Sequence, residues 1–552
     1  MSDLPENAPS MLAAAVILDE LVALGVTDIV CCPGSRSAPL VYAAADQESK
    51  GRIRLHMRLD ERAAGYFGLG IAKSSGRAVA VITTSGTAVA NLAPSLAEAR
   101  YARVPLIALT ADRPATLVGT GANQTADQVG IFGTIPLLLA RISATDLAPA
   151  AWRAVVRRVV VTAQGQLTRQ AGPVHLNIEL PFPLVGQIPA VPPSRSFHID
   201  APSQAVPVEL PPGPRTVIVA GDMGVDQGRW WWKQAERTRT PLLAEPSSNA
   251  RCGSSAIAGY RYLVSGFSNQ IERVVLVGHP TVSRSVTALL SRTDIEIIAV
   301  DACGQWSDPG WAVSAVFSNL VLSKGDPTWM KQWLDADRLL RNQIDSEKVW
   351  SGHTVAAVVI ETLTETDKLV LGASNPIRDA DLAPISPHPP QVYSNRGLSG
   401  IDGTIATACG IAAAGCEPVV ALVGDLTAIH DISSLAKPVW ERSVNLKVVI
   451  ADDHGGSLFS CLEYPQVDIG EPNWFERLFA LPMDIDLALA IRGFGVAVVE
   501  VNSLPQLCDA LRTNHEGLQV IHASLDRYNR AEYEQQLTNW GTKAASEAAR
   551  PS

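Results

Sequence analysis

Short, continuously apolar runs alternate with longer helix-compatible segments along most of this chain, and this alternation limits the possible folds more than any other feature. Ile29–Cys32, Val79–Ile82, Leu106–Leu109 and Val174–Ile178 are such runs in the first third. Strands that are apolar throughout are buried on both faces, as in parallel sheets covered by helices. Because β-α-β connections are right-handed, the pattern predicts doubly wound α/β domains.

The same layout occurs twice, on either side of a smaller unit. Prolines recur between Pro181 and Arg215, which interrupts regular hydrogen bonding and indicates an extended linker. A second α/β pattern follows this linker, and a third begins near Gly352. With 552 residues the chain is long enough for three domains. We expect a first domain at residues 1–185, a linker at 186–213, a central domain at 214–345 and a third domain at 346–552, each domain with a mostly parallel sheet.

Composition excludes several classes of function. The net charge of -10, without a dense Lys/Arg run, argues against a nucleic-acid partner. The start lacks a basic flank with an apolar signal core, and no apolar run approaches the roughly 20 residues that span a bilayer. The 8 cysteines include no C-x-x-C pair, which argues against a disulfide framework or a zinc site. We expect a cytoplasmic protein with free thiols and no membrane span.

Carboxylates and glycines follow two predicted strands of the third domain. They are Gly424, Asp425 and Leu426 after the run at 418–423, and Asp452, Asp453, His454, Gly455 and Gly456 after the run at 447–451. Ligands of open α/β sheets bind at the carboxyl ends of the strands. Oxygen donors beside glycine turns suit a magnesium ion that holds a diphosphate, whereas zinc prefers Cys and His. His430 and His454 keep zinc as an alternative, and either turn alone is compatible with an ordinary connection.

Further motifs make a family resemblance specific. They are Cys32–Ser37, Asp60–Arg62, Thr84–Ala88, Ala111–Pro114, Gly121–Gln124, Ser394–Gly397 and Gly400–Gly403. The Gly-Asp turn with its second Asp-rich turn resembles the magnesium diphosphate motif of thiamine-diphosphate enzymes. The seven ordered segments resemble one branch of them, the 2-succinyl-5-enolpyruvyl-6-hydroxy-3-cyclohexene-1-carboxylate synthases of menaquinone biosynthesis. The resemblance runs from about Met11 to Phe494, with the central domain similar only in layout.

This resemblance implies a pyrimidine-binding first domain, a diphosphate-binding third domain and thiamine diphosphate with Mg²⁺, or Mn²⁺ in its place, as cofactors. It implies a transferase that decarboxylates 2-oxoglutarate and adds the succinyl-semialdehyde carbanion to isochorismate, releasing CO2. It also implies a homodimer or homotetramer with active sites at the subunit interface. These small-molecule substrates and the second copy of the chain are the expected partners.

The resemblance also assigns the cofactor site. Glu61 is the catalytic residue that hydrogen-bonds the aminopyrimidine ring. The metal ligands are the side chains of Asp425 and Asp453 and the carbonyl of Gly455, with Asp452 as the alternative to Asp453, because many relatives have asparagine in this turn. Ile401 supports the bent cofactor and Phe459 shields the site from water. The remaining cofactor-binding positions are Ser374, Gly424, Leu426 and Gly456.

The implied substrates carry two carboxylates each, and the planar guanidinium of arginine suits such groups. The residues assigned to substrate binding are Ser35, Arg36, Arg113, Asn123, Gln124, Arg378 and Arg396. Gln124, Arg378 and Arg396 are also assigned catalytic roles. Each of the four arginines comes shortly after a predicted strand, where its side chain can reach the crevice.

Two other functions remain as alternatives. A different thiamine-diphosphate decarboxylase or carboligase, such as an acetolactate synthase, would not need so many arginines around the acceptor. A non-catalytic scaffold of the same fold is kept open by the unusual Asp452–His454 turn. A serine hydrolase gains no support because no G-x-S-x-G elbow occurs. Beyond about Tyr528 the sequence forms a tail whose last residues are rich in Ala, Ser and Glu, and we expect these last residues to fray.

Overall fold

The computed structural model describes residues 5, 8–145, 148–191, 193–203, 205–346, 349–467, 470, 473–527 and 529–550. By its internal contacts the chain divides into two compact units. Unit 1 comprises Met1–Ser203, Asp402–Cys416 and His430–Val444, and unit 2 comprises Gln204–Ile401, Glu417–Ile429 and Asn445–Ser552. Two segments from the last third of the chain are therefore grouped with the first third, which differs from the sequence-predicted ranges. The three-domain division stays a prediction.

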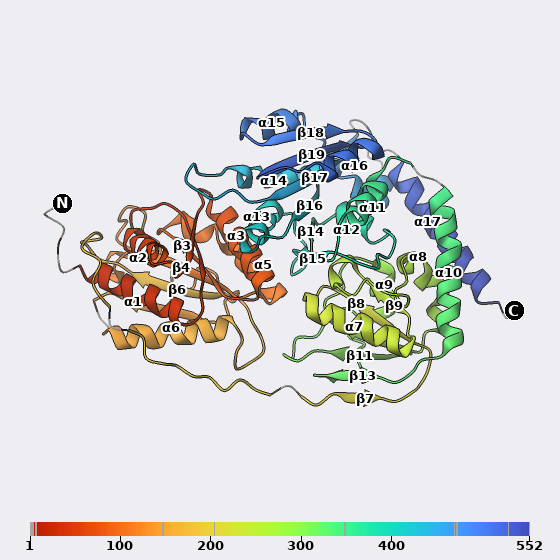
Figure 1. Cartoon of the computed structure of the whole chain (residues 1–552), viewed down its shortest axis with the longest axis horizontal. Helices are drawn as coiled ribbons and strands as arrows, with labels where there is room; N and C mark the ends of the chain where they lie inside the picture. The colour runs from red at the N-terminus through yellow and green to blue at the C-terminus, as the bar shows by residue number, and fades with distance from the viewer. Residues whose placement is uncertain are drawn as a thin grey trace. The chain divides into compact units, whose positions relative to one another are not determined.

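Unit 1 is built on a parallel sheet with helices on both faces (Figure 1). Its strands are β1 (Asp28–Cys31), β2 (Arg54–Met57), β3 (Val79–Thr83), β4 (Leu106–Asp112), β5 (Leu139–Ser143) and β6 (Val174–Glu179), in the order β2-β1-β3-β4-β6-β5. Its helices are α1 (Pro9–Ala23), α2 (Ala38–Ser49), α3 (Glu61–Ser75), α4 (Thr87–Ala90), α5 (Ala93–Ala102) and α6 (Pro149–Ala163). Alternate strand residues point to opposite faces. Ala80 and Ile82 accordingly join the core under α1, α2 and α6, while Val81 lies against α3.

Helix α13 (Thr404–Ala414) packs closely against α3, although the two lie far apart in the sequence. A Cβ built at Gly70 of α3 would lie 2.1 Å from the carbonyl oxygen of Thr407, and one built at Gly410 would lie 2.0 Å from that of Phe67. Glycine at both positions is what lets the two backbones approach. This crossing explains why residues 402–416 belong to unit 1.

Unit 2 contains a second parallel sheet of five strands in the order β12-β11-β10-β8-β9. These strands are β8 (Thr216–Ala220), β9 (Leu242–Ala244), β10 (Arg273–Val277), β11 (Glu296–Val300) and β12 (Ala315–Phe317). The helices around them are α7 (Val225–Thr238), α8 (Tyr260–Phe267), α9 (Arg284–Leu290) and α10 (Pro327–Ser346). A separate pair joins β7 (Val208–Leu210) to β13 (Leu320–Leu322). Part of the predicted linker therefore forms regular hydrogen bonds, which its proline content did not lead us to expect.

The third sheet, also in unit 2, has six parallel strands in the order β15-β14-β16-β17-β19-β18. The strands are β14 (Lys368–Leu371), β15 (Gln391–Ser394), β16 (Val419–Gly424), β17 (Leu446–Asp452), β18 (Ala497–Val501) and β19 (Leu518–Ser524). The helices that follow or flank them are α11 (Gly352–Thr362), α12 (Asn375–Ala380), α14 (Asp425–His430), α15 (Leu487–Gly493) and α16 (Leu504–Arg512). The strand order repeats that of the first sheet position by position.

The chain ends in helix α17 (Arg530–Ala548), where the sequence suggested a frayed tail. That expectation is wrong for the described part of the tail. Leu537, Ala544 and Ala545 are buried in one apolar cluster with Trp329 and Trp333 of α10, so the small alanines serve as close-packing surface. Figure 1 shows α17 running beside α10.

The predicted fold class is confirmed: the chain is α/β, with parallel sheets flanked by helices. Across the residues that the structure describes, no helix combines the length and the apolar character needed to cross a membrane.

Candidate active site

Glu61 is the first residue of α3 and follows β2 closely. The preceding Asp60 caps the helix: its carboxylate accepts hydrogen bonds from the backbone N–H groups of Arg62 at 2.9 Å and Ala63 at 3.3 Å. The Glu61 carboxylate is half-buried and accepts a hydrogen bond from Nδ2 of Asn91 at 3.3 Å. A helix start is a favourable place for a carboxylate because of the backbone dipoles. Glu61 is therefore fixed in position while remaining accessible.

Three of the predicted motifs meet beyond the ends of β3 and β4. Ser85 donates from Oγ to the carbonyl oxygen of Gln124 at 2.9 Å, and Gln124 donates from Nε2 to the carbonyl oxygen of Ser85 at 3.0 Å. Nε of Arg113 also donates to the Gln124 carbonyl oxygen, at 3.3 Å. The turn needs glycine at Gly86, which has φ +83° and lies close to the Gln124 side chain. The structure thus brings together Arg113 and Gln124 of the predicted substrate site.

A buried network of mostly neutral side chains, which also includes Asp112, lies beneath this loop cluster. Gln128 accepts the N–H of Gly86 at Oε1 (3.0 Å), and its Nε2 donates to Oδ1 of Asn177 (3.0 Å). Asn177 donates to Asp112 at 2.7 Å, and Asp112 accepts the backbone N–H of Arg113 at 2.7 Å. One continuous chain of hydrogen bonds therefore connects the Gly86 turn to Arg113.

Thr110 extends the network to His175, whose Nε2 lies 2.8 Å from the threonine Oγ1, while this hydroxyl donates to Asn177 at 2.8 Å. Burial lowers the pKa of His175 to about 4, so the ring is neutral at pH 7. Burial raises the pKa of Asp112, against the hydrogen bond from Asn177. Sequence reasoning quoted Asp112 only as part of a motif and missed the roles of Thr110, Gln128, His175 and Asn177. The available signal was polar His175 and Asn177 within a strand that the pattern placed in a buried sheet.

The other predicted substrate residues of unit 1 differ in their exposure to solvent. Ser35 and Asn123 are exposed. Arg36 is 3% exposed, donates to the carbonyl oxygen of Leu180 at 2.6 Å and stacks over the Phe182 ring at 4.7 Å. Burial lowers its pKa, and the charge of Arg113 lowers the pKa further. The two guanidinium groups thus lie within electrostatic range of each other.

The two carboxylate turns of unit 2 meet at the ends of paired strands β16 and β17. Asp425, 6% exposed, accepts the N–H of Gly455 at 2.7 Å. Burial, followed by the charges of Asp453 and Asp452, raises the pKa of Asp425 to about 7. Gly455 has φ +129°, and a Cβ there would lie 2.4 Å from the carbonyl oxygen of Ala480. Only glycine therefore fits this turn, which brings the N–H group of Gly455 to Asp425.

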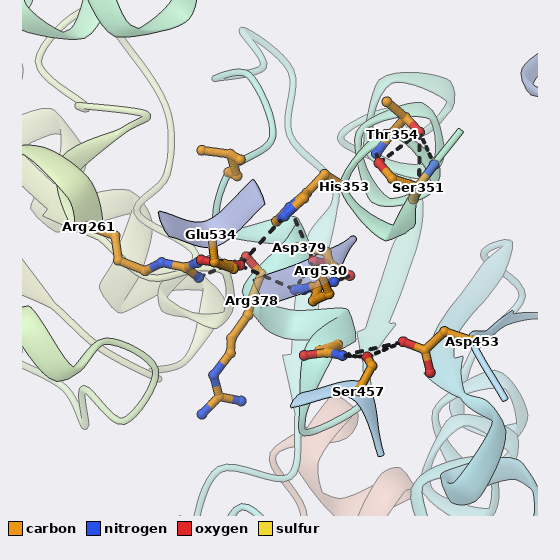
Figure 2. Close-up of polar contacts among 12 residues, drawn as sticks. Arg261, Ser351, His353, Thr354, Arg378, Asp379, Asp453, Ser457, Arg530 and Glu534 are labelled. Atoms are coloured by element: carbon orange, nitrogen blue, oxygen red, sulfur yellow. Dashed lines mark hydrogen bonds and ion pairs between the residues drawn. The ribbon is translucent and has the colours of Figure 1, made fainter. Parts of the chain in front are cut away.

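The adjacent residues Asp452 and Asp453 have different hydrogen-bond partners. Asp452 accepts from Nε2 of His522 at 2.6 Å and from the N–H of His454 at 2.9 Å; burial raises its pKa, but these partners lower it overall. Asp453 instead accepts from Oγ of Ser457 (Figure 2), and burial raises its pKa to about 6 despite that bond. The buried Asp425 and the half-buried Asp453 both have raised pKa values and therefore favour a nearby cation, which fits a divalent metal.

Zinc gains no support from the described residues, among which no group of three or more His, Cys, Asp or Glu side chains could hold a metal ion. His430 instead lies 2.9 Å from Nη1 of Arg62 through its Nδ1. Magnesium differs because it is usually held by one or two carboxylates together with phosphate oxygens.

Arg378 and Arg396 lie in different surroundings within unit 2. Arg378 in α12 donates to the carbonyl oxygen of Ser374 at 2.7 Å; burial, then the charges of Arg396, Arg261 and Arg530, lowers its pKa to about 10. Arg396 is 2% exposed and donates from Nε and Nη2 to Oγ1 of Thr281 at 2.9 and 2.6 Å. The lowered pKa of Arg378 shows that its positive charge is destabilised by burial and by the neighbouring guanidinium groups, which favours an anionic ligand beside it.

Glu245 supports the loop that holds Arg396, and it too was missed from the sequence. Its carboxylate accepts the N–H groups of Thr281 and Val282 at 2.7 to 3.0 Å. Burial raises the pKa of Glu245 to about 8. A lone glutamate after a short strand carries no sequence signal for such a role.

The remaining predicted cofactor positions lie at or near the same strand ends. Ser374 has φ +70° and precedes α12, and Gly424 and Leu426 flank Asp425. Gly456 leaves room for the Phe459 ring, which a Cβ there would approach to 2.8 Å. Phe459 itself packs in an aromatic group with Tyr464 and Phe479, at 6.0 Å between ring centroids in each case. Ile401 is half-buried.

Comparison with known proteins agrees with this arrangement. Residues 11–131 match the family described as thiamine pyrophosphate enzyme, N-terminal TPP binding domain, and residues 379–523 match the corresponding C-terminal TPP binding domain. The chain is 42% identical to a 2-succinyl-5-enolpyruvyl-6-hydroxy-3-cyclohexene-1-carboxylate synthase of Kineococcus radiotolerans, over 93% of this chain and 95% of that protein. The chain belongs to this synthase family.

Two further members of the synthase family give the same coverage. A protein of that name from Nocardioides sp. is 40% identical over 97% of this chain and 98% of its own length. A third, from Mycobacterium avium, is 38% identical over 94% and 97%. The resemblance identified from the motifs is thereby confirmed, and it includes the central domain, where the motifs indicated only a similar layout.

Proposed function

We propose that this chain catalyses the thiamine-diphosphate-dependent decarboxylation of 2-oxoglutarate and the transfer of the resulting four-carbon unit to isochorismate. The products are 2-succinyl-5-enolpyruvyl-6-hydroxy-3-cyclohexene-1-carboxylate and CO2, in menaquinone biosynthesis. The observation that carries the proposal is the near-full-length identity of about 40% to synthases of this name. The surroundings of the candidate residues supply independent support.

The cofactor fits the residues present. Asp425, Asp453 and the carbonyl group of Gly455 are proposed to hold Mg²⁺, or Mn²⁺ in its place, and through it the diphosphate. Asp453 is preferred to Asp452 because the latter is already engaged by His522 and the backbone. When bound, thiamine diphosphate supplies the electron sink that decarboxylation of a 2-oxo acid requires. Glu61 is proposed to hold a proton at its carboxylate against the aminopyrimidine ring.

The proposed substrates are dianions, and arginines are proposed to bind their carboxylates. Arg36 and Arg113 in unit 1 and Arg378 and Arg396 in unit 2 are proposed to bind carboxylates, with Ser35, Asn123 and Gln124 orienting neutral groups. Arg378 and Arg396 are the strongest candidates, because their clustered charges gain most from an anion. Phe459 and its aromatic neighbours are proposed to exclude water from the reacting carbon.

We also propose that the protein is a homodimer or homotetramer with shared active sites, located in the cytoplasm. Large apolar side chains of unit 1 support the assembly: Leu59 is 74% exposed, Val439 86% and Trp440 97% in the single chain. Leu59 lies two residues before Glu61, so a second subunit covering it would also approach the catalytic carboxylate. Light scattering of the purified protein measures the assembly directly.

The test mixes purified protein with thiamine diphosphate, Mg²⁺ and 2-oxoglutarate, with and without isochorismate, and follows isochorismate absorbance and CO2 release together. Consumption that requires every component is the expected result. If CO2 is released while isochorismate is left unchanged, isochorismate is not the acceptor. This result would favour another carboligase activity. No CO2 release despite bound thiamine diphosphate would favour a non-catalytic scaffold.

A further inference from the structure

The short helix α12 is a junction between the proposed cofactor site and the proposed substrate site. Ser374 precedes it, Arg378 lies on it, and two neighbouring residues, Asn375 and Asp379, are buried. The helix has six residues and no side-chain cap. An isolated helix of this length is unstable, so its position depends on tertiary contacts.

One set of contacts holds the start of α12. Nδ2 of Asn375 donates to Oγ of Ser457 at 2.5 Å and lies 3.5 Å from Oδ2 of Asp453. Ser457 in turn donates to Asp453, the proposed metal ligand (Figure 2). The start of the helix is thus tied to the carboxylate turn that follows β17.

A second set of contacts comes from the C-terminal helix α17 and holds the other end. The Arg530 guanidinium pairs with both oxygens of Asp379, at 2.6 and 3.1 Å, and the exposed fractions of the two side chains are 9% and 3%. Glu534, one turn further along α17, accepts from Nη2 of Arg261 at 2.8 and 3.1 Å. Nη1 of Arg261 donates to the carbonyl oxygen of Arg378 at 3.1 Å. Two residues of α17 therefore hold this end of α12, Arg530 through the Asp379 carboxylate and Glu534 through Arg261, which binds the Arg378 carbonyl oxygen.

The packing around Asp379 leaves little room for adjustment. A Cβ at Gly352, where α11 begins, would lie 2.3 Å from Oδ2 of Asp379, so the carboxylate fits closely against this helix start. Figure 2 shows Asp379, Arg530 and Glu534 gathered together, while the guanidinium group of Arg378 points away from them. The ionic cluster thus constrains the backbone of Arg378, while its guanidinium group lies outside the cluster and donates from Nη1 to the Ser374 carbonyl oxygen.

We propose that Arg530 and Glu534 of the C-terminal helix are positioning residues, which hold α12 so that Arg378 presents its guanidinium group to a substrate carboxylate. This inference rests on the proposed function in that Arg378 is taken to bind substrate. Arginine is required at position 530 because its planar fork spans both carboxylate oxygens of Asp379, whereas lysine offers one point of attachment.

The test compares the holoenzymes of wild type, Arg530→Lys, Glu534→Gln and Leu537→Ala in the complete assay. Leu537 lies on the same helix, is fully buried against the central apolar cluster and is not part of the ionic cluster, so it is the matched control for simple destabilisation. We expect Arg530→Lys and Glu534→Gln to raise the KM of one of the two dicarboxylate substrates about tenfold, because small displacements of a binding group are costly. Leu537→Ala should lower the melting temperature without changing either KM.

A double-mutant comparison makes the result specific. In an Arg378→Lys background, which lacks the fork that the cluster positions, Arg530→Lys should cause little further loss. Hydrogen exchange of residues 375–381 should accelerate in Arg530→Lys and not in Leu537→Ala. Unchanged KM values and unchanged exchange in Arg530→Lys, with wild type active and Arg378→Lys impaired, would overturn this inference alone. An inactive wild type would overturn the proposed function, while the exchange comparison would still test whether α17 holds α12.

Discussion

The first and third sheets share one strand order, yet their carboxyl ends are built from opposite chemistry. In unit 1 the loops are joined through Gln128, Asn177 and Thr110, which are neutral side chains in a buried network. In unit 2 the corresponding edge carries the carboxylates of Asp425, which is buried, and of Asp453, which is half-buried. Similar topology therefore places residues at similar positions without determining what they do.

The difference has a physical consequence for ligand binding. The unit 1 network consists mostly of neutral side chains, and its one named carboxylate, Asp112, is hydrogen-bonded by Asn177 and by the backbone of Arg113, so the network is stable without a ligand. Like charges that lie close together away from water are costly unless a counter-ion neutralises them. The raised pKa values of Asp425 and Asp453 express this cost. Unit 1 thus holds its loops ready before a ligand arrives, while the carboxylate edge of unit 2 gains stability when a cation binds. The predictions below test this contrast.

The largest expected effect is on catalysis in unit 1. Glu61→Gln keeps the size of the side chain and removes the proton-transfer group, so we expect kcat to fall by about 10² to 10⁴. The affinity for thiamine diphosphate should change little, because the diphosphate is proposed to bind in unit 2. Steady-state kinetics and calorimetric titration measure the two quantities. Loss of cofactor affinity equal to the loss of kcat would contradict the proposed separation of roles.

The next effect concerns the charged edge of unit 2. Asp425→Ala removes both a proposed metal ligand and the acceptor of the Gly455 N–H. We expect the affinity for thiamine diphosphate in Mg²⁺ to fall by about 100-fold or more. Asp453→Asn is the matched variant, because an amide oxygen can still bind the metal, and it should retain magnesium-dependent activity. Equal collapse of both variants, or of neither, would refute the assignment.

A third prediction places a charge in the neutral network of unit 1. Gln128→Glu retains the acceptor for the Gly86 N–H but loses the donor to Asn177 and adds a carboxylate near Asp112. We expect a loss of about 2 kcal/mol in the free energy of unfolding and a several-fold rise in one substrate KM. Gln166→Glu, an exposed position in the same unit, is the control. Equal stability of the two variants would mean that the network does not depend on neutrality.

Most of the sheet framework was predictable because each buried strand is a short apolar run bounded by turn residues. The tertiary contacts between these elements were not predictable from the sequence. The crossing of α3 with α13 depends on Gly70 and Gly410 meeting backbone carbonyl groups of the other helix, and helical glycines alone do not reveal their partner. The buried face of α17 is formed partly by Ala544 and Ala545. In the sequence alone, such small side chains suggest a segment that packs too little apolar surface to stay ordered.

For the candidate site, the motifs supplied the residues that are proposed to contact ligands, and missed those that support them. Arg378 and Arg396 were named, whereas Arg530 and Thr281, which contact α12 and Arg396, were not. Supporting residues come from distant parts of the chain and need only a charge or a hydroxyl group in the right place. Such roles depend on packing, so no local sequence pattern predicts them.

The smallest predicted effect is a pH dependence confined to the neutral network. Burial lowers the pKa of His175 from 6.5 to about 4, so below pH 6.5 the unfolded chain binds a proton that the folded chain does not. Stability from this group is therefore complete well above pH 6.5 and is lost as the pH falls toward 4, by about 1.4 kcal/mol at pH 5.5. His175→Gln should remove this part of the acid sensitivity, measured as the melting temperature at pH 7.5 and 5.5. His388→Gln, at an exposed position in unit 2, should leave the pH dependence as in wild type. If His175→Gln and His388→Gln show the same pH dependence, protonation of His175 does not lower the stability of unit 1 in acid. The network would then tolerate a charge, as the carboxylate edge of unit 2 does.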